Sequence, residues 1–223
     1  MERKTAVVIG ATGLTGAQVV EALLADDYFQ KVRILVRRPV SFHHEKLDVQ
    51  ITDFNHLHEL EPKLGKGDIL FCCIGTTAKK VRGDKQEYRK IDYDIPVTAA
   101  RLAVQLGYSQ FLLMSAVGAN AAAANFYLQL KGSVEEDVAA MPFRSIHIFR
   151  PSLLLGKRNE RRLGEGIAKV LLPVISFLLI GSLKKYKPIH SSEVARAMVA
   201  AAKQNLDGVY TYQYDAIRRL AAI

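Results

Sequence analysis

The chain has 223 residues, the length of one large domain, and its composition of 49% hydrophobic and 24% charged residues is ordinary for a globular protein. The formal net charge of +9 gathers in basic clusters at 79–85, 157–162 and 184–187, which indicate either a solvated surface or a positive funnel for an anionic ligand. No known nucleic-acid-binding module accompanies these charges, which argues against a nucleic-acid partner, and no Cys/His spacing indicates a metal site.

The first two thirds of the chain alternate short apolar runs with helical patterns. Short apolar runs between turn signals predict buried strands, and apolar residues recurring every three or four positions predict helices. This alternation is typical of an α/β protein with a doubly wound parallel sheet covered by helices on both faces. We predict strands at 5–10, 31–38, 47–54, 68–75, 110–116 and 144–151, and helices at 14–27, 56–64, 88–107 and 125–141.

Two punctuating residues fall in the predicted helix 88–107. Pro96 is expected at a kink or near a helical start, and Gly107 is the expected stop signal. After Arg150 the alternation loosens, and the tail predicts a helix at 191–204, a strand at 208–212 and a helix at 214–223. We expect a single domain over 1–223, in which residues 152–190 form a small lid that covers the substrate.

One apolar stretch, "VLLPVISFLLIGSL" at 170–183, needs testing as a membrane span. It covers only 14 residues and contains a proline, whereas a spanning helix needs about 20 apolar residues. The stretch fits a buried helix or a homo-oligomer interface through 167–183, or contact with a membrane surface through its flanking basic residues. The start of the chain has no apolar signal region, and Cys72 and Cys73 are adjacent and cannot join distant segments, so we expect a cytoplasmic protein.

The stretch "VVIGATGLTG" places three glycines at three-residue intervals between the first predicted strand and the first predicted helix. The first glycine allows a sharp turn, the second lets the backbone approach a pyrophosphate, and the third permits close packing of helix and sheet. Free N–H groups at the helix start would hold the phosphates, and threonine hydroxyls can add donors. The predicted dinucleotide-binding loop comprises Gly10, Thr12, Gly13, Leu14, Thr15 and Gly16.

The second predicted strand ends in "LVRRP", with Arg37 and Arg38 where an NAD site typically offers a carboxylate to the ribose 2′-hydroxyl. A carboxylate would repel a 2′-phosphate, whereas a guanidinium can bind it through two hydrogen bonds. The sequence therefore predicts NADP(H) rather than NAD(H). Asp53, after the third strand, either approaches the adenine or caps the helix that follows.

The segment "YLQLK" places Tyr127 and Lys131 four residues apart, on one face of a helix. A neighbouring ammonium favours the phenolate, so we expect a lowered Tyr127 pKa that suits a general acid or base. Ser115 ends the fifth predicted strand, at the carboxyl edge where α/β sheets bind ligands, and its hydroxyl can orient a substrate carbonyl.

The motifs "GATGLTG", "MSAVGA" and "YLQLK" resemble the short-chain dehydrogenase/reductase superfamily, in its atypical or extended form. "RPSLLLGKRNERR" and "YKPIHSSEVARAMVAAA" further resemble its Tat-interactive-protein-like oxidoreductases. The resemblance runs along essentially the whole chain and implies a Rossmann fold, NADP(H) and a Ser115–Tyr127–Lys131 triad. It also implies that the segment after Pro151 meets the nicotinamide and the substrate, and we add Gly75 and Thr76 to the predicted cofactor site. No asparagine can be assigned as a fourth member of the proton relay.

We therefore predict an NADP(H)-dependent carbonyl reductase or alcohol dehydrogenase, whose partner is a small carbonyl or alcohol. One alternative is a regulator that senses NADPH without turnover. Another is a nucleotide-sugar epimerase, which needs NAD and usually a larger C-terminal domain than the residues after Pro151 provide.

Overall fold

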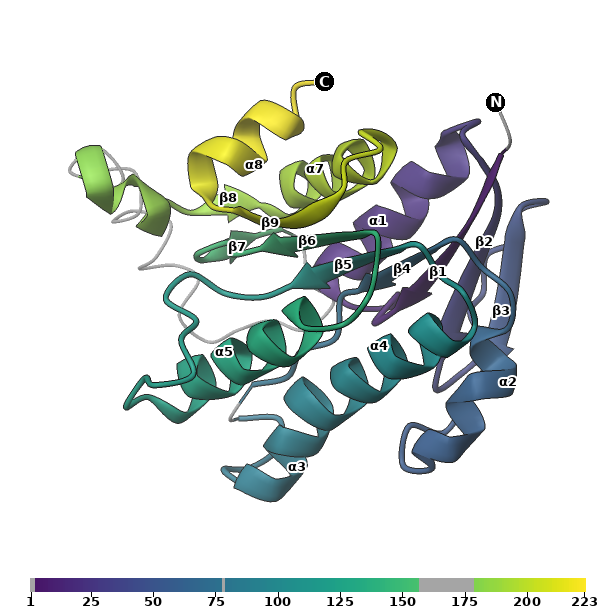
Figure 1. Cartoon of the computed structure of the whole chain (residues 1–223), viewed down its shortest axis with the longest axis horizontal. Helices are drawn as coiled ribbons and strands as arrows, with labels where there is room; N and C mark the ends of the chain where they lie inside the picture. The colour runs from purple at the N-terminus through teal and green to yellow at the C-terminus, as the bar shows by residue number, and fades with distance from the viewer. Residues whose placement is uncertain (1–2, 78, 157–178) are drawn as a thin grey trace.

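Seven parallel strands form the central sheet of the computed structural model, which describes residues 3–77, 79–156 and 179–223 (Figure 1). Strands β1 to β6 account for six of the seven, and β9 joins one edge of the sheet. In spatial order the strands are β3 (Leu47–Ile51), β2 (Phe29–Val36), β1 (Lys4–Ile9), β4 (Ile69–Cys72), β5 (Gln110–Met114), β6 (Ser145–Phe149) and β9 (Gly208–Tyr212).

The central strands β4, β5 and β6 are buried along their whole length, which explains their continuous apolar sequences. Successive residues of a buried strand point to opposite faces of the sheet and pack into two different hydrophobic cores, one on each face. On β1, Val8 belongs to one core, whereas Val7 and Ile9 belong to the other. A one-residue slip of register would exchange the two sets of side chains, so the dual burial fixes the pairing.

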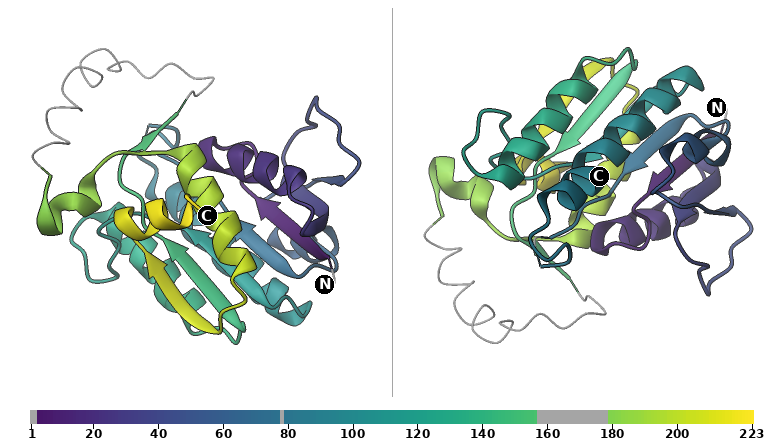
Figure 2. Two further views of the ribbon diagram at one scale, coloured as in Figure 1. Left: turned by 90° about the horizontal axis from the view of Figure 1, so that it is seen from above. Right: turned by 90° about the horizontal axis from the view of Figure 1, so that it is seen from below.

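Helices cover both faces of the sheet, as the views from above and from below in Figure 2 show. One face packs against α1 (Leu14–Ala25), α7 (Ser191–Lys203) and α8 (Tyr214–Leu220). The other face carries α2 (Leu60–Leu64), α3 (Lys85–Arg89), α4 (Ile95–Gln105) and α5 (Phe126–Ala139). The predicted doubly wound, Rossmann-type α/β fold is therefore confirmed.

The predicted helix 88–107 is a continuous helical run of three pieces. A π-helical turn, η2 (Lys90–Asp94), lies between α3 and α4, and in it the Ile95 N–H donates to the carbonyl of Lys90. Pro96 follows at the start of α4 and has no N–H to offer to the carbonyl four residues earlier, that of Asp92. We attribute the wider turn to this missing bond, and of the two expected places for Pro96, a kink or a helical start, the structure shows the helical start.

Beyond β6 the structure contains short elements that periodicity did not predict. They are the paired strands β7 (Leu154–Leu155) and β8 (Ile189–His190) and the 3₁₀ helix η3 (Gly181–Tyr186). The helix predicted at 56–64 begins as a 3₁₀ turn, η1 (Leu57–Glu59), which continues into α2. Most of the predicted lid 152–190, and residues 167–178 of the predicted oligomer interface, lie outside the described residues. None of the helices in the described part of the chain has the length and apolar composition needed to cross a bilayer.

Hydrogen bonds and ring stacking within a buried polar cluster connect the edge strand β9 to β6. His147 is fully buried, with its Nε2 2.8 Å from Ser145 Oγ and its Nδ1 2.9 Å from the Tyr212 hydroxyl. The His147 ring also stacks on Tyr212, with ring centroids 5.8 Å apart. Burial lowers the pKa of His147 to about 4, so the ring is neutral in the folded protein at neutral pH.

His147 is expected to make folding stability depend on pH. Its pKa is about 4 when folded and about 6.5 when unfolded, so the unfolded chain binds more protons between these values. Its contribution is complete above pH 6.5 and is lost as the pH falls toward 4, a loss of about 2 kcal/mol by about pH 5. Urea unfolding of wild type and His147→Gln across this range measures it, because the variant should show a flatter pH dependence. His43→Gln, an exposed histidine, is the control, and equal slopes for all three proteins would contradict the expectation.

Candidate functional site

The glycine loop between β1 and α1 lies at the carboxyl edge of the sheet. Gly10 has φ +79°, and a Cβ there would lie 2.5 Å from the carbonyl carbon of Cys73, at the end of the adjacent β4. A Cβ at Gly16 would overlap the Gly10 carbonyl oxygen, so both positions require glycine for close approach. The Gly13 N–H donates to the Gly10 carbonyl at 3.0 Å, and Gly13 is the N-cap of α1 without a capping side chain.

The other loop residues differ in exposure. Thr12 is exposed, Leu14 is half-buried, and Thr15 is buried with an Oγ1 that has no hydrogen-bond partner among the described residues. The described part of the predicted lid approaches this loop, since a Cβ at Gly156 would lie 2.9 Å from Leu14 Cδ1. An uncapped helix start and a buried, unpaired hydroxyl are features that a bound phosphate would satisfy.

Arg37 and Arg38 follow β2, which pairs in parallel with β1, so both lie at the same edge as the glycine loop. Both side chains are exposed, and neither has a hydrogen bond or ion pair to any residue in the described ranges. Asp53 is also exposed; its Oδ1 accepts the Asn55 N–H at 2.9 Å, and this bond lowers the Asp53 pKa. The helical turn η1 has His56 as its N-cap, so the expectation that Asp53 caps this helix is wrong.

Tyr127 and Lys131 lie one turn apart on α5, as predicted, and Lys131 is buried. Its Nζ lies 3.0 Å from Oδ1 of Asp92, which is itself 0% exposed on the π-helical turn η2. The other Asp92 oxygen accepts the Thr76 N–H at 2.8 Å. A Cβ at Gly75 would lie 3.5 Å from Asp92 Oδ1 and 3.8 Å from Lys131 Nζ. The structure thus brings Tyr127 and Lys131 together with the predicted Gly75–Thr76 loop through a carboxylate that sequence reasoning missed.

Asp92 was not recognised because one aspartate in an amphipathic helical run is usually solvent-exposed. The available signal was the segment "KIDYDIP", in which this aspartate lies four residues before a proline. That proline widens the helical turn there, and π turns are frequent at functional sites.

The predicted lowering of the Tyr127 pKa is wrong. Burial raises the Tyr127 pKa, the Lys131 ammonium lowers it, and the Asp92 carboxylate raises it again, with a net increase. Burial is the largest influence on the Lys131 pKa and lowers it, but the charge and hydrogen bond of Asp92 and the charges of Tyr127 and Cys72 together raise this pKa above its ordinary value, so Lys131 stays protonated. The Tyr127 ring also stacks on Tyr88, with centroids 6.1 Å apart and planes 12° apart.

Ser115 belongs to a second buried network. Its hydroxyl donates to Oε1 of Glu135, one turn after Lys131 on α5, and Glu135 also accepts from Nε and Nη2 of Arg150. Pro151 is buried at the end of β6, and its carbonyl accepts the Val117 N–H at 2.9 Å. The Ser115 hydroxyl is therefore directed at Glu135, which differs from the expectation that it is free to orient a carbonyl.

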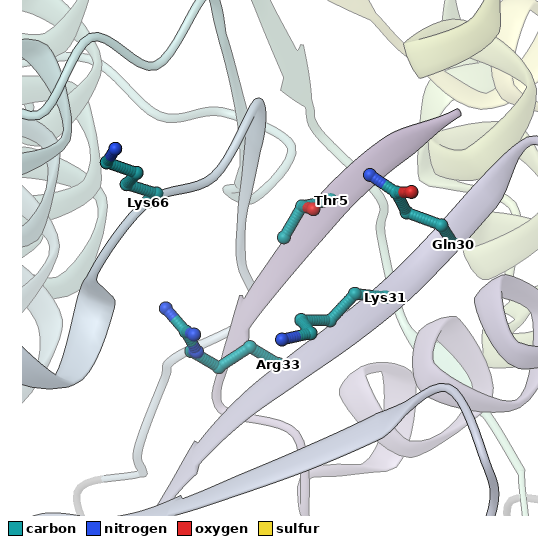
Figure 3. Close-up of a pocket in the computed structure, with 5 residues that line it drawn as sticks. All are labelled: Thr5, Gln30, Lys31, Arg33 and Lys66. Carbon is teal, nitrogen blue, oxygen red and sulfur yellow. The ribbon is translucent and has the colours of Figure 1, made fainter. Parts of the chain in front are cut away.

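An open pocket of about 400 Å³ lies at the opposite, amino edge of the sheet (Figure 3). Its walls come from the first residues of β1 and β2 and from the loop before β4, namely Thr5, Gln30, Lys31, Arg33 and Lys66. Arg33 is already bound to Asp48, with Nε 2.8 Å from Oδ2. Because ligands of parallel α/β sheets bind at the carboxyl edge, we place the candidate site at the glycine loop and not at this pocket.

Comparison with known proteins identifies similar sequences along most of the chain. Residues 10–142 match the model of a family described as NAD(P)H-binding. The chain is 35% identical to Protein HTATIP2 of Rattus norvegicus over 172 residues, 76% of this chain and 70% of the relative. It is 33% identical to Protein FMP52, mitochondrial, of Debaryomyces hansenii, over 91% of this chain and 89% of the relative. Several further FMP52 relatives are also named mitochondrial, which contradicts the prediction of a cytoplasmic protein.

Solved structures share the fold at low sequence identity. A UDP-N-acetylglucosamine 4-epimerase from Methanobrevibacter ruminantium, in complex with UDP-N-acetylmuramic acid, superimposes with a TM-score of 0.71 at 18% identity, covering 96% of this chain and 77% of that chain. The Bordetella bronchiseptica enzyme WbmH, in complex with NAD+, gives 0.70 at 17% identity, covering 95% and 76%. At these identities the likeness supports the Rossmann-type fold alone.

The glycine loop generates a stability prediction with an internal control. Gly10→Ala should destabilise the protein by about 2 kcal/mol more than Gly83→Ala, because overpacking adds to backbone strain only at Gly10. Both glycines have φ +79°, but nothing lies within 4 Å of a Cβ at Gly83. Urea unfolding of the two variants measures the difference, and equal losses would show that the close approach to Cys73 is absent.

Proposed function

The chain belongs to the NAD(P)H-binding family that includes the HTATIP2 and FMP52 proteins, and from that membership we propose that it is an NADP(H)-dependent oxidoreductase acting on a carbonyl or alcohol. The carrying observation is the Tyr127–Lys131 pair on α5, held by Asp92 at the sheet edge that carries the glycine loop. A phenol one helical turn from a buried ammonium is a suitable proton-transfer group beside a nicotinamide.

The residues of the glycine loop fit a dinucleotide. The uncapped start of α1 and the backbone from Gly10 to Gly16 would receive the pyrophosphate, and the unpaired Thr15 hydroxyl supports a bound acceptor there. Leu14 and the exposed Thr12 would border it. Gly75, Thr76 and Pro151, which flank the Asp92–Lys131 pair and the Ser115 network, would line the nicotinamide end.

Arg37 and Arg38, which are exposed and have no ion-pair partner in the described part of the chain, support NADP(H) over NAD(H). They lie at the end of β2, where the adenosine ribose binds in this fold. No carboxylate competes for them among the described residues, so their guanidinium groups are available to a 2′-phosphate. Asp53 is exposed after β3 and would border the adenine.

In the proposed reaction the nicotinamide supplies or accepts a hydride. Tyr127 donates its phenolic proton to the substrate oxygen during reduction and accepts a proton during oxidation. Lys131 stays protonated beside Asp92 and can donate a hydrogen bond to the cofactor ribose. Ser115 would have to release Glu135 before donating to the substrate oxygen, so we assign it first to shaping the site through Glu135 and Arg150.

The cofactor preference has a direct test in thermal shifts. A ligand at one hundred times its dissociation constant stabilises a protein by about 2.7 kcal/mol, so NADPH should raise Tm more than NADH does. Replacing Arg37 and Arg38 by alanine should weaken NADPH binding about tenfold or more and leave NADH binding nearly unchanged. Arg101→Ala, an exposed arginine on α4, is the matched control. A larger shift with NADH in the wild type would contradict the NADP(H) assignment.

Tyr127→Phe tests the chemical step. Removing the phenolic hydroxyl should reduce NADPH-dependent turnover about a hundredfold or more while the NADPH-induced thermal shift remains. Turnover is measured as loss of NADPH absorbance with a panel of aldehydes and ketones that includes 4-nitrobenzaldehyde. Tyr93→Phe, whose hydroxyl donates to Asp137 on the neighbouring face of the helix layer, is the control.

Full activity of Tyr127→Phe would exclude the proton-transfer role. A wild-type protein that binds NADPH but turns over no member of the panel would instead fit the NADPH-sensing alternative.

A further inference from the structure

We propose that Asp92 is a positioning residue for the Tyr127 site, because its carboxylate holds Lys131 in place and opposes the field of the Lys131 ammonium at the Tyr127 phenol. This inference rests on the proposed role of Tyr127 and adds the ionisation state from which Tyr127 works. A lysine alone would favour the phenolate and lower the Tyr127 pKa, so the carboxylate raises the pH at which the phenol ionises.

The carboxylate of Asp92 lies close to the ammonium of Lys131. Asp92 Oδ1 lies 3.0 Å from Lys131 Nζ, and the two side chains are 0% and 4% exposed. Little water is present to screen either charge, so each acts strongly on neighbouring groups, and at Tyr127 the two charges act in opposite directions. The Thr76 N–H holds the second carboxylate oxygen at 2.8 Å and so fixes the direction in which Asp92 faces.

The elements packed around Tyr127 contribute few other charges. From α3, Tyr88 stacks on it as a neutral ring, and burial raises the Tyr88 pKa. Lys85 of α3 is directed at the neighbouring ring, with its Nζ 5.5 Å from the Phe126 centroid. Within the described residues, Lys131 and Asp92 are therefore the charged groups that act on the Tyr127 phenol, one in each direction.

The consequence for the chemistry concerns the reductive direction. A carbonyl becomes an alcohol when its carbon receives a hydride from NADPH, which is oxidised to NADP⁺, and its oxygen receives a proton. A neutral Tyr127 supplies that proton and regains one from water. Reduction should therefore be steady through neutral pH and fall only when the Tyr127–Lys131 pair loses its first proton.

The test measures Tyr127 directly, by NMR of protein labelled with ¹³C in the tyrosine rings. Tyr127→Phe assigns the signal. Asp92→Asn should lower the pH at which Tyr127 titrates by about one unit, because the Lys131 field is then unopposed. Asp94→Asn is the matched control, since Asp94 lies on the same π-helical turn but faces Arg89, with Oδ1 3.5 Å from its Nε. A Tyr127 titration in Asp92→Asn at the wild-type pH or above would overturn the proposal.

A double-mutant cycle on Asp92 and Lys131 separates the electrostatic effect of the two charges on Tyr127 from any structural change that the substitutions cause. Lys131→Met should raise the pH of Tyr127 titration, and the double variant Asp92→Asn/Lys131→Met should return it close to the wild-type value. The double variant leaves no unpaired buried charge, so it also serves if Asp92→Asn fails to fold. A double variant that titrates with Lys131→Met would overturn the proposal.

The NMR titration of Tyr127 tests the role of Asp92, and the rate of carbonyl reduction tests the proposed function, so either can be contradicted without the other. If a substrate is turned over, the alkaline fall of its reduction should shift in Asp92→Asn by the same interval as the Tyr127 signal. If no carbonyl is reduced by the wild type, the proposed function fails while the titration still decides the role of Asp92.

Discussion

The buried ion pair between Lys131 and Asp92 links the parts of the candidate site. Lys131 comes from α5, Asp92 from the π turn before α4, and the Thr76 N–H, which Asp92 accepts, from the loop after β4. Burying two charges is costly unless each is paired and hydrogen-bonded. The ion pair and the Thr76 bond together offset part of that cost, so displacing either helix would leave a buried charge unpaired, and displacing the loop would remove the hydrogen bond to Asp92. This explains how two helices and a loop can be held in one arrangement at the open edge of the sheet.

The same edge depends on close backbone approach at the glycine loop. Gly10 lies against the Cys73 carbonyl, and Gly16 against Gly10, so α1 starts close to the ends of β1 and β4. The strand order puts β4 next to β1, and the loop after β4 carries Thr76. The glycine loop and the Lys131–Asp92 pair are thus connected through residues 73–76, directly after β4. A cofactor held at the loop would therefore extend toward α5 and Tyr127.

Sequence patterns predicted the fold well because the determinants of this fold are local. Continuous apolar runs identify strands buried on both faces, and the spacing of Gly10, Gly13 and Gly16 is legible along the chain. Asp92, Glu135 and Arg150 were not assigned, because their partners come from distant segments and no periodicity records such contacts. The sign of the Tyr127 pKa shift was wrong for the same reason. The sequence displays Lys131 at one helical turn, whereas the opposing burial and the Asp92 charge arise only in the folded chain.

The candidate site has exposed cations at one end and a buried cation at the other, and the difference in burial determines whether each cation needs a carboxylate partner. Arg37 and Arg38 are exposed and unpaired within the described residues, so their charge remains available to an anion arriving from water at little desolvation cost. Lys131 is buried, and burial lowers its pKa, but neighbouring charges, of which Asp92 is the strongest, raise this pKa and keep the ammonium charged. An exposed cation can therefore serve binding without a partner, but a buried cation near the chemistry needs a carboxylate, and that carboxylate then also acts on the neighbouring phenol. The ionisation of Tyr127 therefore depends first on its own burial and then on both members of this buried pair.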